Sequence, residues 1–201
     1  NNNPYPFIII DNFLKTESIK KLNNDFNVNT SDAIHYKHFS EDKKGLTKFD
    51  SFSPFIKKLI NELYSEHFIQ ILSEITNNKN LKGDFELHGG GLHQVENNGF
   101  LKIHRDFGNH PSNIKWKRKI NLLLYINPIW EEKWNGNLEF WNKELTEQLV
   151  SIQPIFNRCV LFDTTDNMHG HPNPLKTENG IVRKSLALYY FEETSQNQKV
   201  K

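Results

Sequence analysis

Short β-rich segments separated by turn residues fill the chain from residue 81 onward, and they limit its fold more than any other feature. Branched and aromatic residues concentrate in these segments, at 84–95, 100–106, 117–127, 137–142, 149–152, 158–163 and 181–192. Glycines or Asn-Gly pairs lie between several of them, at 89–91, 98–99, 135–136 and 179–180. Asn and Gly adopt the positive φ that tight turns require. Short strands at this spacing predict an antiparallel sandwich or barrel such as a jelly roll.

The first 80 residues show a mainly helical pattern instead. A strand is expected at 6–10, and Thr16 is expected to cap a helix that runs to about residue 26. Residues 28–52 are polar and irregular, which predicts a loop or lid. Ser53-Pro54 is typical of a helix start, and a further helix is expected from Ser65 to about residue 76.

The predicted fold class is therefore α+β, with a jelly-roll core packed against N-terminal helices. The organisation is predicted as one domain over 1–201. It comprises a mainly helical part at 1–80, the jelly-roll core at 81–192 and a polar, frayed tail at 193–201.

Charge and cysteine content exclude some classes of protein. The chain has 201 residues, with 25 Lys and Arg against 24 Asp and Glu, so its net charge of +1 gives no overall attraction to nucleic acid or to an anionic membrane. No apolar run approaches the roughly 18 residues of a membrane span, and no secretory signal is visible, so a cytoplasmic location is expected. The one cysteine, Cys159, cannot form an internal disulfide and is interpreted as a small buried hydrophobe.

Three residues far apart in the chain predict a metal site. On a strand, His104 and Asp106 would point to the same face because they are two residues apart. His169 follows in a segment expected to be a turn, with His171 as an alternative. Two histidines and one carboxylate describe the facial triad of non-haem iron(II), which leaves three coordination positions open. A 2-oxo acid can fill two of them and dioxygen the third. The distal carboxylate of 2-oxoglutarate needs a permanently charged partner, which Arg183 can provide.

In this order and spacing, His104-x-Asp106, His169 and Arg183 resemble the iron(II)/2-oxoglutarate-dependent dioxygenase superfamily, in particular its prolyl 4-hydroxylase-like branch. Further similarities are Leu124-Tyr-Ile-Asn127 followed by Trp130, Asn135-Gly-Asn-Leu138 in place of the family's Gly-Gly-x-Leu, and the opening Pro6-Phe-Ile-Ile-Ile-Asp-Asn-Phe-Leu14. The resemblance covers most of residues 5–192.

The resemblance implies a double-stranded β-helix, with His104, Asp106 and His169 as the metal-binding and catalytic residues. It implies that Arg183 and Tyr125 bind 2-oxoglutarate, and that dioxygen and, as a further reductant, ascorbate take part. The expected reaction is hydroxylation of an unactivated C–H bond, with release of succinate and CO2. The substrate would be a protein-bound or free amino acid or a small metabolite, and neither nucleic acid nor membrane is an expected partner.

The identity of the substrate stays open in the sequence. The stretch between His169 and Arg183, which includes 173–180, is a few residues longer than in the animal prolyl hydroxylases, and it could shape the substrate pocket. His93, Gln94 and Arg118 are candidate substrate contacts, although ordinary core or rim polarity explains them as well. Two alternatives from other classes are a zinc-dependent hydrolase and a non-enzymatic jelly-roll module that binds sugar. The sequence predicts no oligomeric state.

Overall fold

The computed structural model describes residues 5–178 and 180–193. The helices are α1 (Thr16–Asp25), α2 (Pro54–Leu63) and α3 (Glu66–Thr76), with short 3-10 helices η1 (Phe49–Ser51) and η2 (Glu132–Trp134). The strands are β1 (Phe7–Ile10), β2 (Ile34–His38), β3 (Glu41–Leu46), β4 (Leu81–Gly83), β5 (Gly91–Val95), β6 (Phe100–His104), β7 (Asn109–His110), β8 (Asn113–Tyr125), β9 (Leu138–Trp141), β10 (Gln148–Ile152), β11 (Cys159–Asp163), β12 (Met168–His171) and β13 (Arg183–Glu193). The predicted tail lies outside the described residues except for Glu193.

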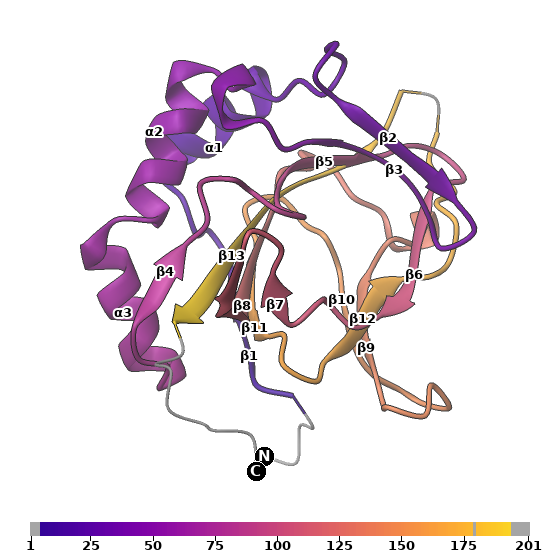
Figure 1. Cartoon of the computed structure of the whole chain (residues 1–201). Helices are drawn as coiled ribbons and strands as arrows, with labels where there is room; N and C mark the ends of the chain where they lie inside the picture. Colours follow the sequence, from indigo (N-terminus) through magenta and orange to yellow (C-terminus); the bar gives the residue numbers. More distant parts are fainter. Residues whose placement is uncertain (1–4, 179, 194–201) are drawn as a thin grey trace.

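Within the described residues, these strands form one antiparallel sheet that curls on itself (Figure 1). Its order is β1-β11-β8-β13-β5-β3-β6-β12-β9-β10, with β2 on β3, β4 on β13 and β7 on β8. Neighbours in the sheet come from distant parts of the chain, as when β13 pairs with β8 and β5. This arrangement confirms the predicted jelly roll.

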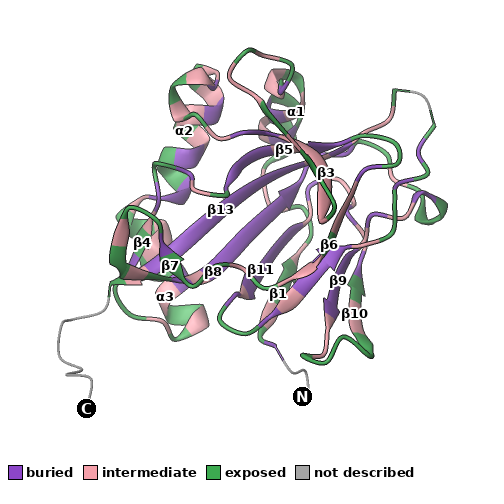
Figure 2. Cartoon of the chain, turned by 45° about the vertical axis from the view of Figure 1, so that its right-hand side comes forward, coloured by how far each residue is buried: buried purple, intermediate pink, exposed green. Residues whose placement is uncertain are grey.

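Alternate residues of the central strands face opposite sides of the sheet, as strand geometry requires. On β8, Leu122 and Leu124 belong to the hydrophobic cluster under the helices, whereas Leu123 and Tyr125 belong to a second cluster inside the curl. The helices contribute mainly aliphatic side chains to the first cluster, namely Ile19, Leu22, Ile56, Ile60, Leu63 and Leu72. Figure 2 shows that β8, β11 and β13 are largely buried. The helices therefore support one face of the sheet and leave the other free to line a cavity.

The helix predictions are confirmed in position, but one predicted cap is wrong. The Oγ atom of Ser53 accepts from the backbone N–H of Ile56 at 3.2 Å, and Ser65 caps α3 in the same way. Thr16 is instead the first residue of α1, and Lys15 holds the cap position without a side-chain hydrogen bond.

Two predicted segments differ from the structure. The segment at 28–52, expected to be an irregular loop, contains the hairpin β2–β3. Its strands carry polar residues on both faces, so the alternation that marks a half-buried strand is absent. The predicted strand at 84–95 begins only at Gly91. The preceding residues turn because the Asp84 carboxylate accepts from the backbone N–H groups of Glu86 and His88.

Two further observations concern the remaining predictions. Cys159 is buried and free, as predicted, and burial raises the pKa of its thiol. Within the described residues, the helices are too short or too polar to cross a lipid bilayer.

Candidate metal centre and co-substrate pocket

Two neighbouring strands bring the three predicted metal ligands together. Strand β12 pairs with β6 so that His169 lies directly opposite His104. The centroids of the two imidazole rings are 4.6 Å apart. Asp106 lies two residues beyond His104, where the chain has just left β6. The strand register therefore fixes the two histidines, and the short connection delivers the carboxylate to them.

The donor atoms of these residues converge on one point. The Nε2 atom of His104 lies 3.7 Å from Asp106 Oδ1, and the Nε2 atom of His169 lies 3.7 Å from Asp106 Oδ2. One donor atom from each residue lies within 4.8 Å of the other two. These separations leave room for a single cation between the three side chains.

The hydrogen bonds of the two histidines fix which nitrogen carries the proton. Nδ1 of His104 faces the Lys102 carbonyl oxygen at 2.9 Å, and Nδ1 of His169 faces the Asn167 carbonyl oxygen at 3.2 Å. Because a carbonyl only accepts, each Nδ1 must donate, and each neutral ring keeps a lone pair on Nε2. Two lone pairs then face the Asp106 carboxylate, whose buried Oδ2 has no hydrogen-bond partner. This arrangement is unfavourable when empty and well suited to a divalent transition metal.

The electrostatics of the centre depend on the charge of Asp106. Burial lowers the pKa of His104, but the Asp106 carboxylate and the Lys102 carbonyl outweigh burial and raise that pKa above its usual value, so a metal that binds here replaces a proton. Burial tends to raise the pKa of Asp106, but His169, His104 and Arg118 together lower it below its usual range. Burial lowers the pKa of His169 to about 4, so its ring is neutral at pH 7. A charged carboxylate and a neutral imidazole are the forms that bind metal.

The second part of the site is a buried arginine, Arg183, which lines the same cavity as the metal ligands. Arg183 is 4% exposed. Its Nε donates to the Gly136 carbonyl oxygen at 2.8 Å, and its Nη2 donates to the Tyr125 hydroxyl at 3.2 Å. Among the described residues, no carboxylate forms an ion pair with this guanidinium. Because a buried charge without a counter-ion is costly, the site is suited to an anion. Burial raises the pKa of Tyr125, so its hydroxyl stays protonated and can donate to that anion.

One cavity of about 330 Å³ connects the metal centre and the arginine. Its wall includes His104, Asp106, His169 and Arg183. Tyr125, the other predicted 2-oxoglutarate contact, is fully buried beside Arg183, with its ring 4.9 Å from the guanidinium.

Two of the three predicted substrate contacts line the cavity, and the third does not. His93 and Arg118 line the cavity, and burial lowers the pKa of His93 to about 3. Gln94 is next to His93 on β5 and is not part of the cavity wall, because successive strand residues face opposite sides. Its amide donates to Glu96 Oε1 at 3.2 Å. His171, the alternative metal ligand, lines the cavity without joining the group formed by His104, Asp106 and His169.

The cavity also has residues that the sequence did not single out. Glu41 and Lys43 of β3 form an ion pair at 2.9 Å and also line the cavity. The sequence predicted a loop or lid over 28–52, which contains both residues. No motif in that segment identifies either of them as a cavity residue. Asn121 and Tyr189 also line the cavity, from β8 and β13.

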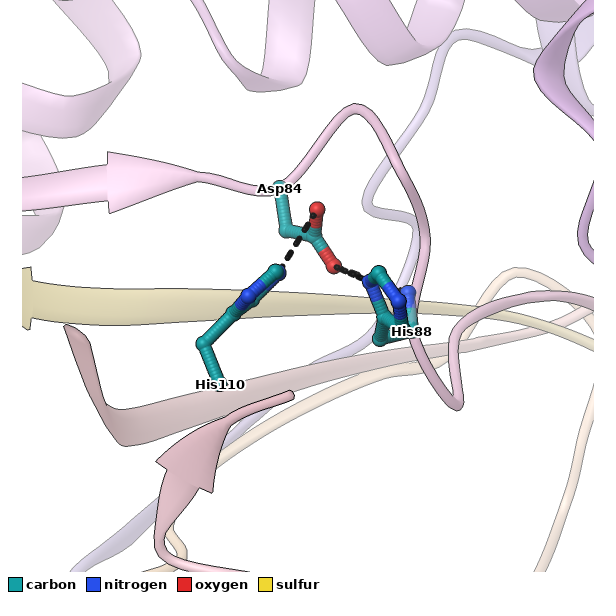
Figure 3. A group of neighbouring side chains, drawn as sticks. All are labelled: Asp84, His88 and His110. Atoms are coloured by element: carbon teal, nitrogen blue, oxygen red, sulfur yellow. Dashed lines mark hydrogen bonds and ion pairs between the residues drawn. The ribbon is translucent and has the colours of Figure 1, made fainter. Parts of the chain in front are cut away.

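A second group of potential ligands, Asp84, His88 and His110, lies outside this cavity (Figure 3). His110 Nε2 is 3.3 Å from Asp84 Oδ1, and His88 Nδ1 is 3.7 Å from Asp84 Oδ2. Here the hydrogen bonding is reversed, because His110 Nδ1 accepts from the Ser112 backbone N–H at 3.1 Å. The neutral ring therefore carries its proton on Nε2, which lies near the carboxylate but forms no hydrogen bond with it. The Asp84 carboxylate already accepts from the backbone N–H groups of Glu86 and His88, so it does not depend on a cation.

Comparison with known proteins agrees with the geometry. A sequence profile of the 2OG-Fe(II) oxygenase superfamily matches residues 90–191. No curated protein sequence matches the chain.

Several solved structures share the fold. A prolyl-4-hydroxylase from Pseudomonas putida superimposes with a TM-score of 0.68 at 11% identity, over 95% of this chain and 94% of the other. A prolyl hydroxylase from Trichoplax adhaerens, in complex with a hypoxia inducible factor peptide fragment, gives 0.61 at 19% identity, over 92% and 83%. HygX from Streptomyces hygroscopicus, with nickel and 2-oxoglutarate bound, gives 0.62 at 11% identity, over 98% and 86%.

Proposed function

Because the chain belongs to the 2OG-Fe(II) oxygenase superfamily and is therefore an iron(II)- and 2-oxoglutarate-dependent dioxygenase, we propose that its iron is held by His104, Asp106 and His169. We further propose that Arg183 and Tyr125 bind the distal carboxylate of 2-oxoglutarate, and that the enzyme hydroxylates an unactivated C–H bond. The products besides the hydroxylated substrate are succinate and CO2.

The observation that carries this proposal is the orientation of the imidazoles around Asp106. Both Nε2 lone pairs face the carboxylate, because both Nδ1 atoms donate to backbone carbonyls. A histidine that only packs in the core has no reason to adopt this tautomer beside a carboxylate, whereas a metal ligand requires it.

When bound, iron(II), 2-oxoglutarate and dioxygen together supply the oxidising power that inserts one oxygen atom into a C–H bond. The chain's own residues bind and orient. Arg183 supplies a fixed positive charge at the end of the cavity, and the Tyr125 hydroxyl supplies a second donor beside it. Aliphatic residues such as Leu123 and Leu138 in the cavity wall exclude water from the reacting region.

For the substrate, we propose a protein-bound or free amino acid or a small metabolite. Structures with the same fold are described as complexes with a peptide fragment and with hygromycin B. The wall of this cavity carries the charged pair Glu41 and Lys43, which favours a polar substrate. The zinc-hydrolase and sugar-module alternatives give no role to a buried Arg183.

The direct test is turnover by the purified protein. The protein is loaded anaerobically with iron(II) and 2-oxoglutarate, then exposed to air while succinate is measured across a panel of peptides, amino acids and metabolites. We expect succinate above the level of a His104→Ala variant, and an increase with the right substrate. If wild type and variant form equal amounts throughout, the proposal is wrong.

A further inference from the structure

A buried arginine lies directly beside the proposed iron-binding carboxylate. The Arg118 side chain is 1% exposed, and its Nη1 lies 3.2 Å from Asp106 Oδ1. Oδ2 of the same carboxylate is buried, has no hydrogen-bond partner and faces His169 Nε2 at 3.7 Å. Each oxygen thus lies 3.7 Å from one histidine Nε2, since Oδ1 is at that distance from His104. The two oxygens still differ, because Oδ1 is paired with the Arg118 guanidinium and Oδ2 has no hydrogen-bond partner.

A β-bulge delivers Arg118 to this position. On the strand pair β8–β13, Tyr190 lies opposite Ile120, but the next residue, Phe191, lies opposite Arg118. Lys119 is thus an extra residue in β8. In a regular strand with no bulge, Arg118 would face the same side as Ile120, toward the helices, because the two residues are two positions apart. A bulge reverses the alternation, and the guanidinium enters the cavity instead.

The guanidinium is clamped on three sides. It lies between two aromatic rings, with its Cζ atom 3.7 Å from the centroid of Phe107 and 3.6 Å from that of Tyr189. Its Nη2 donates to the His88 carbonyl oxygen at 3.0 Å. That carbonyl is itself held in place, because the His88 backbone N–H donates to Asp84 Oδ2 at 2.8 Å. Stacking and hydrogen bonding in different directions hold the guanidinium beside Asp106, while its buried Nε has no hydrogen-bond partner.

From this arrangement we infer that Arg118 is a positioning residue that restricts Asp106 to binding iron through Oδ2 alone. This inference rests on the proposed metal ligands. A carboxylate can chelate a metal through both oxygens, and it would then occupy one of the three positions that 2-oxoglutarate and dioxygen need. With Oδ1 held by a fixed guanidinium, that position stays open.

The inference predicts opposite effects on metal and co-substrate. Arg118→Met keeps an unbranched apolar side chain between Phe107 and Tyr189, so the stacking gap stays filled. Without the cation, Asp106 can chelate, and the metal keeps its affinity. We expect the Kd for Mn²⁺ to change by less than about threefold, and the Kd for 2-oxoglutarate of the Mn²⁺-loaded protein to rise at least about tenfold.

A second variant separates orientation from charge. Arg118→Lys keeps the positive charge, but a single ammonium group cannot hold Asp106 and the His88 carbonyl in the same planar geometry. We expect its 2-oxoglutarate affinity to lie between those of Arg118→Met and wild type. The matched control is Lys117→Met, which removes a cation from the adjacent, exposed position of β8 and should leave both constants unchanged.

Three measurements on the full chain decide the matter: the Mn²⁺ affinity, the 2-oxoglutarate affinity, and the infrared carboxylate bands that distinguish one-oxygen from two-oxygen coordination. Circular dichroism checks that each variant is folded. Wild type should show one-oxygen coordination and Arg118→Met two-oxygen coordination. Full rescue by lysine, unchanged 2-oxoglutarate affinity in Arg118→Met, or loss of metal affinity instead would each overturn the inference. Failure of wild type to bind Mn²⁺ would instead overturn the proposed metal site.

Discussion

At the scale of single residues, Arg183 offers the clearest separation of co-substrate binding from metal binding. Its guanidinium is buried and without a carboxylate partner among the described residues, and its nearest polar contacts are Tyr125 and the Gly136 carbonyl. In Arg183→Met, the charge-assisted hydrogen bonds to 2-oxoglutarate are lost, which costs about 2–3 kcal/mol. We expect the KM for 2-oxoglutarate to rise about 30- to 150-fold, while the Kd for Mn²⁺ stays within about threefold because no metal ligand changes.

The neighbouring residue provides the control for this variant. Lys184 follows Arg183 on β13 and faces the other side of the sheet, where its Nζ donates to Asn23. Lys184→Met removes the same charge one position away and should leave the KM for 2-oxoglutarate unchanged. Equal effects of the two variants, or equal effects of Arg183→Met on metal and co-substrate, would contradict the proposed role.

His93 makes a prediction about pH. Burial, together with the nearby charges of Lys43 and Arg183, lowers its folded-state pKa to about 3, against about 6.5 when unfolded. The folded state thus disfavours the protonated ring. Above pH 6.5 the His93 ring is neutral in both states and costs no stability. As the pH falls from 6.5 toward 3, the ring takes up a proton only in the unfolded state, so the folded state loses stability.

The measurement compares wild type with His93→Gln in the presence of a chelator, by denaturant unfolding at pH 6.5 and 5. Because the side chain is only partly shielded from solvent, we expect wild type to lose about 1 kcal/mol more than the variant between these values. Other titrating groups affect both proteins alike. Parallel pH dependences of the two proteins would show that His93 is not neutral in the fold.

At the scale of elements, the start of α2 links two helices. The Ser53 hydroxyl accepts from the Ile56 backbone N–H and donates to Asp25 Oδ2 at 2.7 Å, near the end of α1. Ser53→Ala removes both bonds and should lower the free energy of unfolding by about 1–2 kcal/mol. Ser73→Ala loses only a bond within α3, to the Ile69 carbonyl, and should stay within about 0.5 kcal/mol of wild type. Urea unfolding measures the free energy of unfolding of both variants. Equal decreases in the two variants would show that the Ser53 cap adds no more stability than an ordinary bond within a helix.

Elements with a local signal were predictable, and those formed by distant pairing were not. Ser53-Pro54 marks α2 because a cap and a first-turn proline act within a few residues. The hairpin β2–β3 has no such signal, because it pairs mainly through its backbone and through polar contacts such as His35 with Asp42. Strand β12 was expected to be a turn. It becomes a strand through pairing with β6 and β9, which lie far away in the chain.

The same distinction applies to the candidate site. The approach of His104 to Asp106 could be expected, because a spacing of two residues on a strand places both side chains on one face. The position of Arg118 could not be predicted, since it depends on the extra residue Lys119, and a bulge leaves no recognisable pattern in one sequence. Gln94 was grouped with His93 for the same reason: without the register of β5, neither could be assigned to a face.

At the scale of the whole molecule, the two faces of the curled sheet have different roles. One face packs against the helices, and the other lines the candidate site. Its outer face carries the larger hydrophobic cluster and the helices, whereas its inner face carries the cavity and the polar residues that line it. The helices can therefore hold the strands in register without contributing a side chain to the cavity wall. This separation explains why residues from β3, β6, β8, β12 and β13 can meet in one site.

The whole molecule also makes a prediction about metal content, because the described residues contain two groups of histidine and carboxylate. In the group of His104, Asp106 and His169, lone pairs face the carboxylate and require a cation. In the group of Asp84, His88 and His110, the Ser112 amide gives His110 the opposite tautomer. The Asp84 carboxylate already accepts from the backbone N–H groups of Glu86 and His88. We therefore expect one equivalent of Mn²⁺ or Co²⁺ per chain, although composition alone would allow two.

Equilibrium dialysis with metal analysis measures this directly in wild type, His104→Ala and His88→Ala. Bound metal should fall to almost none in His104→Ala and stay at one equivalent in His88→Ala, since removing His88 takes away no lone pair that a metal uses. Two equivalents in wild type, or loss of metal in His88→Ala, would mean that the Ser112 amide yields its hydrogen bond to a metal. In that case metal binding would determine which ring nitrogen is protonated. The protonation of His104 and His169 in the empty site would then no longer be evidence for a metal site.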